Sequence, residues 1–143
     1  IIITAQGKNV APQHVEGALS ADPSIEQVVV VGDRRSYLTA LVVPSFELLE
    51  RYAEEQGIEF SSHEDLVRAP EVRTFYDARI VEASKELAAY EQVKRYTLMP
   101  QEFTQESGQM TPTLKLKRRV IEEEYRTLID GMYDSASGPE GPR

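Results

Sequence analysis

The chain has 143 residues and a formal net charge of −8 at pH 7, with 41% hydrophobic and 28% charged residues. This length suits one domain with a buried core, and the acidic balance argues against nucleic acid as a partner. The sequence contains no cysteine, which excludes disulfides and thiolate metal sites and predicts a reducing, cytoplasmic location.

Other sequence features exclude further classes of protein. His14 and His63 are too far apart to offer metal-ligand spacing, so no metal site is predicted. No apolar run approaches membrane-spanning length, and no basic segment precedes an apolar signal core. The chain opens on Ile1-Ile2-Ile3, already inside a predicted strand, and we expect it to belong to a longer polypeptide.

The N-terminal part predicts a hairpin followed by a short helix. Residues 1–11 favour a β-hairpin with Ala5-Gln6-Gly7 at its turn, where Gly7 can supply a positive φ. Pro12 suits the first turn of a helix, and Asp22-Pro23 ends it.

Two runs rich in β-branched residues, Ile25–Val31 and Tyr37–Val43, predict antiparallel neighbours in a buried sheet. The stretch Val28–Val31 is too continuous for a strand with one buried face. We therefore expect helices on both faces of the sheet, or a central position for this strand.

Three helical segments are predicted next. Ser45 can cap a helix that runs to about Gln56, with Gly57 after it, and Ser61-Ser62-His63-Glu64 resembles a capping box that opens a short helical turn. A longer helix is predicted from Pro70 to about Ala89, because apolar residues recur at helical spacing: Val72, Tyr76, Ile80, Ala83 and Leu87.

The C-terminal third predicts a strand, a helix and a tail. Tyr90–Leu98 alternates like a third strand. A helix from near Arg118 has one predicted apolar side, made of Val120, Ile121, Tyr125, Leu128 and Met132. The remainder, Tyr133–Arg143, is rich in Ser, Gly and Pro, and we expect it to be disordered. The predicted fold class is α+β: residues 1–132 form a small, mainly antiparallel sheet with an N-terminal β-hairpin, packed by several helices.

A compact basic segment lies just ahead of the last predicted helix. Residues 111–119 carry Lys115, Lys117, Arg118 and Arg119 and no acidic residue, on a chain that is acidic as a whole. Gly108 and Pro112 keep the first half of this region out of regular structure. Such a segment indicates either a local anionic ligand or a solvated run of cations at a helix entry.

Three stretches, in the same order along the chain, resemble the adenylate-forming acyl-CoA synthetases. Residues 111–118 (TPTLKLKR) resemble the last motif of that superfamily, in the form carried by its long-chain fatty acid branch. The wider motif usually reads Ser-Gly-Lys; its lysine aligns with Lys115, and Leu114 stands where its glycine does. Residues 90–96 through Pro100, and residues 1–12 followed by Val15-Glu16, resemble the same branch.

This resemblance implies the small, mobile C-terminal domain of such a ligase, without its N-terminal domain. The implied enzyme joins a fatty acid to ATP, giving acyl-AMP and pyrophosphate, and CoA then displaces AMP. Lys115 is implied as the adenylation lysine. The hairpin that carries Gly7, Lys8 and Asn9 is implied to face the pantetheine arm of CoA in the thioester-forming state. Lys117 and Arg118 are weaker candidates, for domain docking or for CoA phosphates.

The same resemblance implies the partners, and it leaves alternatives open. Fatty acid, ATP, CoA and Mg²⁺ would be bound mainly by the N-terminal adenylation domain, and the intact enzyme could associate peripherally with a membrane. One alternative is a ligase that stops at acyl-AMP or loads a carrier protein. Another is a stand-alone binding or regulatory module that kept the fold but lost catalysis.

Overall fold

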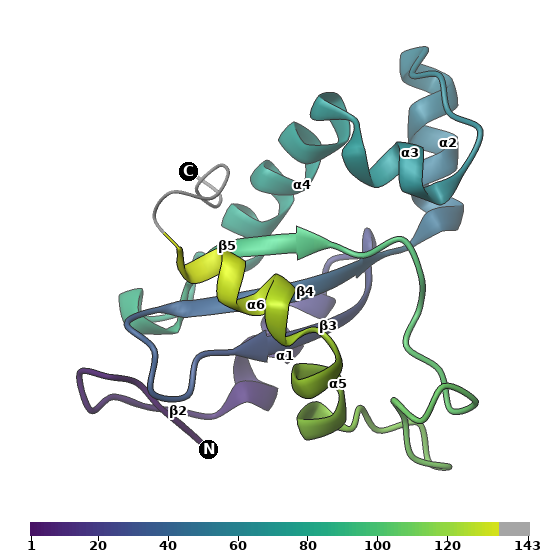
Figure 1. The fold of residues 1–143 in the computed structure, drawn as a ribbon. Coiled ribbons are helices and arrows are strands. Elements are labelled where there is room, and N and C mark those ends of the chain that lie inside the picture. The colour runs from purple at the N-terminus through teal and green to yellow at the C-terminus, as the bar shows by residue number, and fades with distance from the viewer. Residues whose placement is uncertain (135–143) are drawn as a thin grey trace.

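The computed structural model describes residues 1–134 as two small sheets packed by six α-helices. Figure 1 shows the arrangement. The elements run in this order: β1 (Ile2–Ile3), β2 (Asn9–Val10), α1 (Pro12–Ser20), β3 (Ile25–Val31), β4 (Leu38–Pro44), α2 (Phe46–Gln56), α3 (His63–Arg68), α4 (Pro70–Ala83), the 3₁₀ turn η1 (Ala89–Glu91), β5 (Val93–Leu98), α5 (Arg118–Glu124) and α6 (Arg126–Tyr133).

The main sheet has the strand order β3-β4-β5. Strands β3 and β4 are antiparallel, with Val29 opposite Leu41, whereas β5 runs parallel to β4. The N-terminal strands β1 and β2 form a separate antiparallel hairpin. The predicted α+β class, with its hairpin and its mainly antiparallel sheet, is confirmed.

The continuous valine run in β3 is buried on both sides, as predicted. Val28 and Val30 pack into a core with α1, α2, α3 and α4, whereas Val29 and Val31 pack into a second core with α5 and α6. In Figure 1, α5 and α6 lie in front of the sheet and α1 lies behind it. Because side chains alternate along a strand, two covered faces require an apolar residue at every position.

Local sequence signals define most helix starts. Pro12 and Pro70 stand at the first turns of α1 and α4, and the Ser45 hydroxyl accepts a hydrogen bond from the backbone N–H of Leu48 at the start of α2. Ser62 caps α3 in the same way, and Gly57 ends α2 in the left-handed conformation. These helix starts are confirmed, but the predicted capping box is displaced by one residue, because Ser62 accepts from the N–H of Asp65 and no Ser61–Glu64 box forms among the described residues.

Two predicted boundaries are wrong. Helix α4 ends at Ala83, and turns follow it. Leu87 is buried in the core from this non-helical segment, so its helical spacing from Ala83 was misleading. Strand β5 begins at Val93 because Ala89–Glu91 forms the 3₁₀ turn.

The last predicted helix is two helices joined at Tyr125, whose φ of −106° and ψ of 25° depart from helical values. This bend rotates the buried face, so Ile129 is buried, whereas Val120 and Leu128 are exposed, contrary to the prediction. Tyr133 also lies in α6 and not in a disordered tail. Residues 135–143 of the predicted tail lie outside the described residues.

Within residues 1–134, no helix has both the length and the apolar character needed to cross a membrane.

Tyr76 offers a direct test of the packing between α4 and the sheet. Its ring is fully buried, and its hydroxyl donates to the backbone carbonyl of Ser24 over 2.7 Å. We expect Tyr76→Phe to lower the free energy of unfolding by about 0.5–1.5 kcal/mol, measured by chemical denaturation, since one net hydrogen bond is lost. Tyr52→Phe, at a half-buried ring on α2, serves as the control and should change stability by less than about 0.5 kcal/mol. Equal effects of the two substitutions would contradict this assignment.

Candidate functional site

The basic segment lies on a long connection between β5 and α5 that is fastened to the domain at its base. The side-chain amide of Gln27 on β3 makes two hydrogen bonds with the backbone of Phe103. The Gln27 oxygen accepts from the Phe103 N–H over 2.8 Å, and the Gln27 nitrogen donates to the Phe103 carbonyl over 3.0 Å. The Phe103 ring is buried in the core beneath α5 and α6. The connection therefore leaves the sheet from a fixed point.

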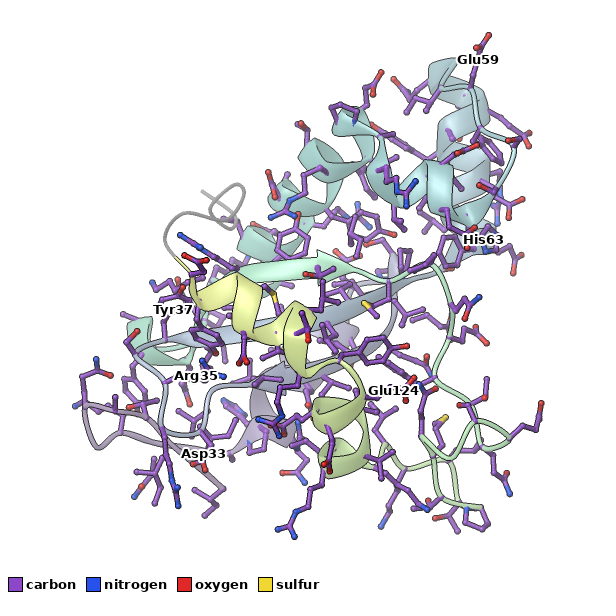
Figure 2. All side chains as sticks on the ribbon, in the orientation of Figure 1. Asp33, Arg35, Tyr37, Glu59, His63 and Glu124 are labelled. Carbon is purple, nitrogen blue, oxygen red and sulfur yellow. The ribbon has the colours of Figure 1, made fainter. Side chains whose placement is uncertain are left out.

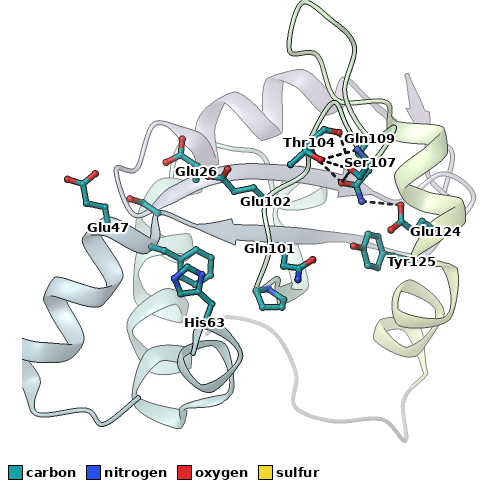
Figure 3. Close-up of a pocket in the computed structure, with 13 residues that line it drawn as sticks. Glu26, Glu47, His63, Gln101, Glu102, Thr104, Ser107, Gln109, Glu124 and Tyr125 are labelled. Carbon is teal, nitrogen blue, oxygen red and sulfur yellow. Dashed lines mark hydrogen bonds between the residues drawn. The ribbon is translucent and has the colours of Figure 1, made fainter. Parts of the chain in front are cut away.

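A buried glutamine holds the middle of the connection. Gln109 is 4% exposed; its side-chain oxygen accepts from the Ser107 hydroxyl (2.6 Å) and from the Thr104 N–H (3.2 Å). Its side-chain nitrogen donates to Glu124 at the end of α5 over 3.0 Å, as Figure 3 shows. Its backbone carbonyl accepts from the N–H of Lys117 over 2.8 Å. Because every polar group of this side chain is used, the loop is tied to α5 in one geometry.

The tip of the connection is a tight turn. The N–H of Leu114 donates to the Thr111 carbonyl over 2.9 Å, and the N–H of Lys115 donates to the Thr111 hydroxyl over 3.0 Å. Met110 and Leu116 form an antiparallel bridge across the turn. Leu114 adopts a φ of +63°, a region that suits glycine far better than leucine. This conformation accounts for the glycine that stands here in the wider motif.

The turn presents two cations to solvent. Lys115 and Lys117 are exposed, and no hydrogen bond or ion pair within residues 1–134 involves either ammonium group. Both lie on the loop just ahead of α5, where the sequence placed them. The side chain of a lysine in this setting stays free to turn toward a group outside the domain.

Arg118 behaves differently from the two lysines. Its guanidinium pairs with the carboxylate of Glu16 on α1, with one N···O distance of 2.9 Å, and it also donates to the carbonyl of Val30 over 2.9 Å. The second carboxylate oxygen of Glu16 accepts from the N–H of Val30 over 2.8 Å. Arg118 therefore fastens the end of the basic segment to β3, and this geometry favours an anchoring role over the predicted phosphate contact.

The hairpin of residues 2–10 is the second candidate element. Its turn closes with the Gly7 N–H donating to the Thr4 carbonyl over 2.9 Å, and Gly7 has a φ of +81°. A side chain at Gly7 would meet no atom of the domain within 4 Å, so the open side of the turn is free for a close external approach. The Lys8 ammonium lies 5.3 Å from the ring centre of Tyr90, and Asn9 pairs with Ile3 in the ladder.

The structure does not bring the two candidate elements together. The hairpin lies at the lower left of Figure 1 and the basic loop at the lower right, with β3 and α5 between them. Each element has its own anchors. Glu16, Gln27 and Gln109 hold the basic loop, and no sequence pattern predicts this role for any of them; Val15-Glu16 stands out in the sequence only as part of the family resemblance.

Comparison with known proteins places this geometry in a family. The family model of the AMP-binding enzyme C-terminal domain matches residues 1–137. The chain belongs to this family. The sequence resemblance to adenylate-forming acyl-CoA synthetases is confirmed.

Named relatives point to the same group. The long-chain-fatty-acid–CoA ligase FadD15 of Mycobacterium tuberculosis is 35% identical over 135 residues, which is 94% of this chain and 22% of that protein. Human long-chain-fatty-acid–CoA ligase 1 is 35% identical over 134 residues, which is 92% of this chain and 19% of that protein. The chain thus spans about a fifth of the length of these relatives.

Solved structures agree on the fold. The adenylation domain of the carboxylate reductase from Mycobacterium chelonae superposes with a TM-score of 0.75 at 30% identity, covering 92% of this chain and 19% of that one. The didomain of adenylation and PCP units of carboxylic acid reductase from Segniliparus rugosus, in complex with AMP, gives a TM-score of 0.73 at 25% identity, covering 92% of this chain and 17% of that one.

This C-terminal domain also carries a pocket of about 640 Å³ at the base of the basic connection, drawn in Figure 3. Four carboxylates and no lysine or arginine are among its lining residues: Glu26, Glu47, Glu102 and Glu124. Burial raises the pKa of the Tyr125 phenol at its edge, and the neighbouring Glu124 carboxylate adds to this effect. Such a lining disfavours anionic ligands. Among residues 1–134, no group of three or more His, Cys, Asp or Glu could hold a metal ion.

Leu114 provides a test of the turn geometry in this C-terminal domain. A leucine at positive φ costs about 1–2 kcal/mol, whereas asparagine tolerates that region and a β-branched residue does not. We expect Leu114→Asn to hold or slightly raise the free energy of unfolding, and Leu114→Val to lower it by about 1 kcal/mol. Leu128→Asn, at an exposed leucine in helix α6, is the matched control and should be mildly destabilising. Indistinguishable stabilities of the Asn and Val variants at position 114 would refute the strained turn.

Proposed function

We propose that this domain works in an AMP-forming long-chain fatty acid CoA ligase. The intact enzyme would join a fatty carboxylate to ATP, releasing pyrophosphate and leaving acyl-AMP, and would then transfer the acyl group to CoA with release of AMP. Family membership and relatives named long-chain-fatty-acid–CoA ligases at 35% identity support this proposal. The activity requires the larger part of the enzyme, because this chain spans about a fifth of such relatives.

The unpaired ammonium of Lys115 on an anchored loop is the observation that carries the proposal. In the adenylation step a carboxylate must approach an α-phosphate that is already negatively charged. A cation placed between the attacking oxygen and that phosphate offsets the repulsion and stabilises the charge of the transition state. Because the loop is fixed by Gln109 and Arg118, Lys115 can be delivered without the cost of ordering a mobile segment.

The Gly7 hairpin would serve the second step. Its open turn allows a backbone approach that a side chain would block, which suits the narrow pantetheine arm of CoA. Lys8 and Asn9 directly follow Gly7, and Lys117 is a secondary candidate beside Lys115. Because the hairpin and the basic loop lie apart, one domain could present them in turn by rotating between the half-reactions.

Substrates and Mg²⁺ would bind mainly on the N-terminal adenylation domain. Figure 3 supports this division for the anionic substrates ATP, CoA and fatty acid, because the pocket drawn there is lined by carboxylates. Carboxylate and phosphate oxygens of the substrates and of that larger domain would hold the Mg²⁺ that accompanies ATP. A cytoplasmic location and peripheral membrane association of the intact ligase stay predictions.

Substitution of Lys115 in the intact ligase tests the proposal. We expect Lys115→Ala to slow fatty-acid-dependent ATP–pyrophosphate exchange by about 10²-fold or more, because one charge contact in the transition state is lost. Conversion of supplied acyl-AMP to acyl-CoA should continue near the parental rate. The control is Lys94→Ala, at an exposed lysine on β5, and it should alter neither rate. Exchange at the parental rate in Lys115→Ala would show that the basic loop is only a solvated surface.

A second candidate function is transfer of the acyl group to a carrier protein. The observation that favours it is the fold match to adenylation domains of carboxylate reductases, one of them solved with its PCP unit. The discriminating measurement is consumption of acyl-AMP by the intact enzyme with CoA alone and with a phosphopantetheinylated carrier alone. Turnover with CoA supports the ligase, and turnover only with the carrier supports this second candidate.

The third interpretation is a stand-alone binding module. We expect the 143-residue chain alone to show no turnover with fatty acid, ATP and CoA. Complementation by a separately supplied adenylation domain would support the ligase proposal, whereas failure of Lys115→Ala to affect that complementation would favour the non-catalytic module.

A further inference from the structure

The hairpin is too small to hold its own shape. Each strand has two residues, and the register consists of Ile2 opposite Val10 and Ile3 opposite Asn9. Isolated two-stranded hairpins are marginally stable in water even when they are much longer. The conformation of the turn at Gly7 must therefore depend on the surface to which the hairpin is attached.

That surface is the β3–β4 turn, residues 32–36. Three hydrogen bonds join the two segments: the Ala5 N–H donates to the Arg35 carbonyl over 2.9 Å, the Arg34 N–H donates to the Ile3 carbonyl over 2.8 Å, and the Ile3 N–H donates to the Asp33 carboxylate over 3.0 Å. Gly32 leaves room for the buried Leu38 side chain beside this turn, because a Cβ there would lie 2.4 Å from Leu38 Cδ2.

Helix α6 in turn holds the β3–β4 turn through Arg35. The Arg35 guanidinium pairs with Asp130 and lies 4.4 Å from the ring centre of Tyr133. In Figure 2, Arg35 and Tyr37 lie at the end of the sheet that faces both the hairpin and the end of α6. The Arg35 side chain thus contacts α6, while its backbone carbonyl holds Ala5.

Two tyrosines reinforce this link. The Tyr37 hydroxyl donates to the Met132 carbonyl over 2.9 Å, and the Tyr133 hydroxyl lies 2.9 Å from the Tyr37 carbonyl. Burial raises the pKa of Tyr133 to about 12, so its hydroxyl stays protonated at neutral pH. The Tyr37 and Tyr133 rings also pack against each other, with their centres 4.8 Å apart.

We propose that Arg35 and Asp130 are positioning residues for the Gly7 hairpin, and therefore for the thioester-forming half-reaction. This inference rests on the proposed function. The contacts described for these two side chains join the β3–β4 turn to α6, and the basic loop is held through other side chains: Glu16, Gln27, Gln109 and Arg118. Loss of the Arg35–Asp130 pair should disturb the hairpin and leave the Lys115 loop in place.

The pair itself contributes little to global stability. The Arg35 and Asp130 side chains are 33% and 52% exposed, and ion pairs open to solvent contribute little to the free energy of unfolding. A change in the rate of one half-reaction without a change in folding would therefore report on position and not on stability.

The test uses Arg35→Met and Asp130→Asn in the intact ligase. We expect conversion of supplied acyl-AMP to acyl-CoA to fall by about 10-fold or more, since misplacement by an ångström can cost up to about 10²-fold. Pyrophosphate exchange should stay within about twofold of the parental rate. The charge-swapped double variant, Arg35→Asp with Asp130→Arg, should recover part of the lost rate. Arg51→Met, which breaks the Arg51–Glu47 pair on α2, is the matched control and should change neither half-reaction.

A Gly7→Val variant separates failure of this inference from failure of the proposed function. If Gly7→Val slows thioester formation and Arg35→Met does not, the positioning role is overturned. If neither does, the assignment of the hairpin to the second step is wrong, and the positioning role falls with it. Equal loss of both half-reactions in Arg35→Met would also overturn the inference. Amide hydrogen exchange adds an independent readout in the 143-residue chain: protection of the Ala5 N–H should fall in Arg35→Met, and that of Gln109 should not.

Discussion

The placement of the basic loop depends on how the outer edge of β3 is satisfied. Strand β3 lies at the edge of its sheet, so the N–H and carbonyl of Val30 have no partner strand on their outer side. Glu16 accepts from that N–H, and Arg118 donates to that carbonyl, while the two side chains pair with each other. One ion pair thus satisfies the outer N–H and carbonyl of Val30 and holds both α1 and the first residue of α5 against β3.

This arrangement connects two segments that are about a hundred residues apart. Glu16 follows the hairpin, and Arg118 ends the basic motif, so both ends of the domain meet at β3. The charged groups are largely shielded, with Glu16 and Arg118 14% and 26% exposed, and each hydrogen bond therefore operates at lower dielectric than at an open surface. Removal of either partner would leave the other charge shielded and unpaired, which is destabilising. The pair therefore holds α1 and the start of α5 in one position on β3.

Sequence patterns predicted the hairpin, the paired strands, the capped helices and the loop that carries Lys115, because each depends on local periodicity, proline or capping chemistry. They failed where tertiary packing decides. Tyr125 interrupts the last helix with no proline or glycine to signal it, and the bend exposes Leu128 and buries Ile129. The anchors Glu16, Gln27 and Gln109 are polar residues with no distinctive spacing, and their partners lie far away in sequence or on another element. The parallel direction of β5 likewise depends on the path of the α2–α4 segment, which a strand pattern does not encode.

Lys115 differs in role from three anchoring arginines of this domain, and the chemistry of the two kinds of side chain explains why. Arg35, Arg79 and Arg118 each bind a carboxylate on another part of the chain, and a planar guanidinium with several fixed donors can also reach a backbone carbonyl at the same time. An arginine at position 115 would offer several donors in a fixed fork, and these could bond to nearby backbone carbonyls and hold the charge within the domain. Lys115 has a compact charge on a flexible stem, and its ammonium group makes no such contact within residues 1–134. The rigid loop and the flexible cation are complementary: the backbone sets where the charge is delivered, and the side chain makes the final adjustment to the anion that it meets.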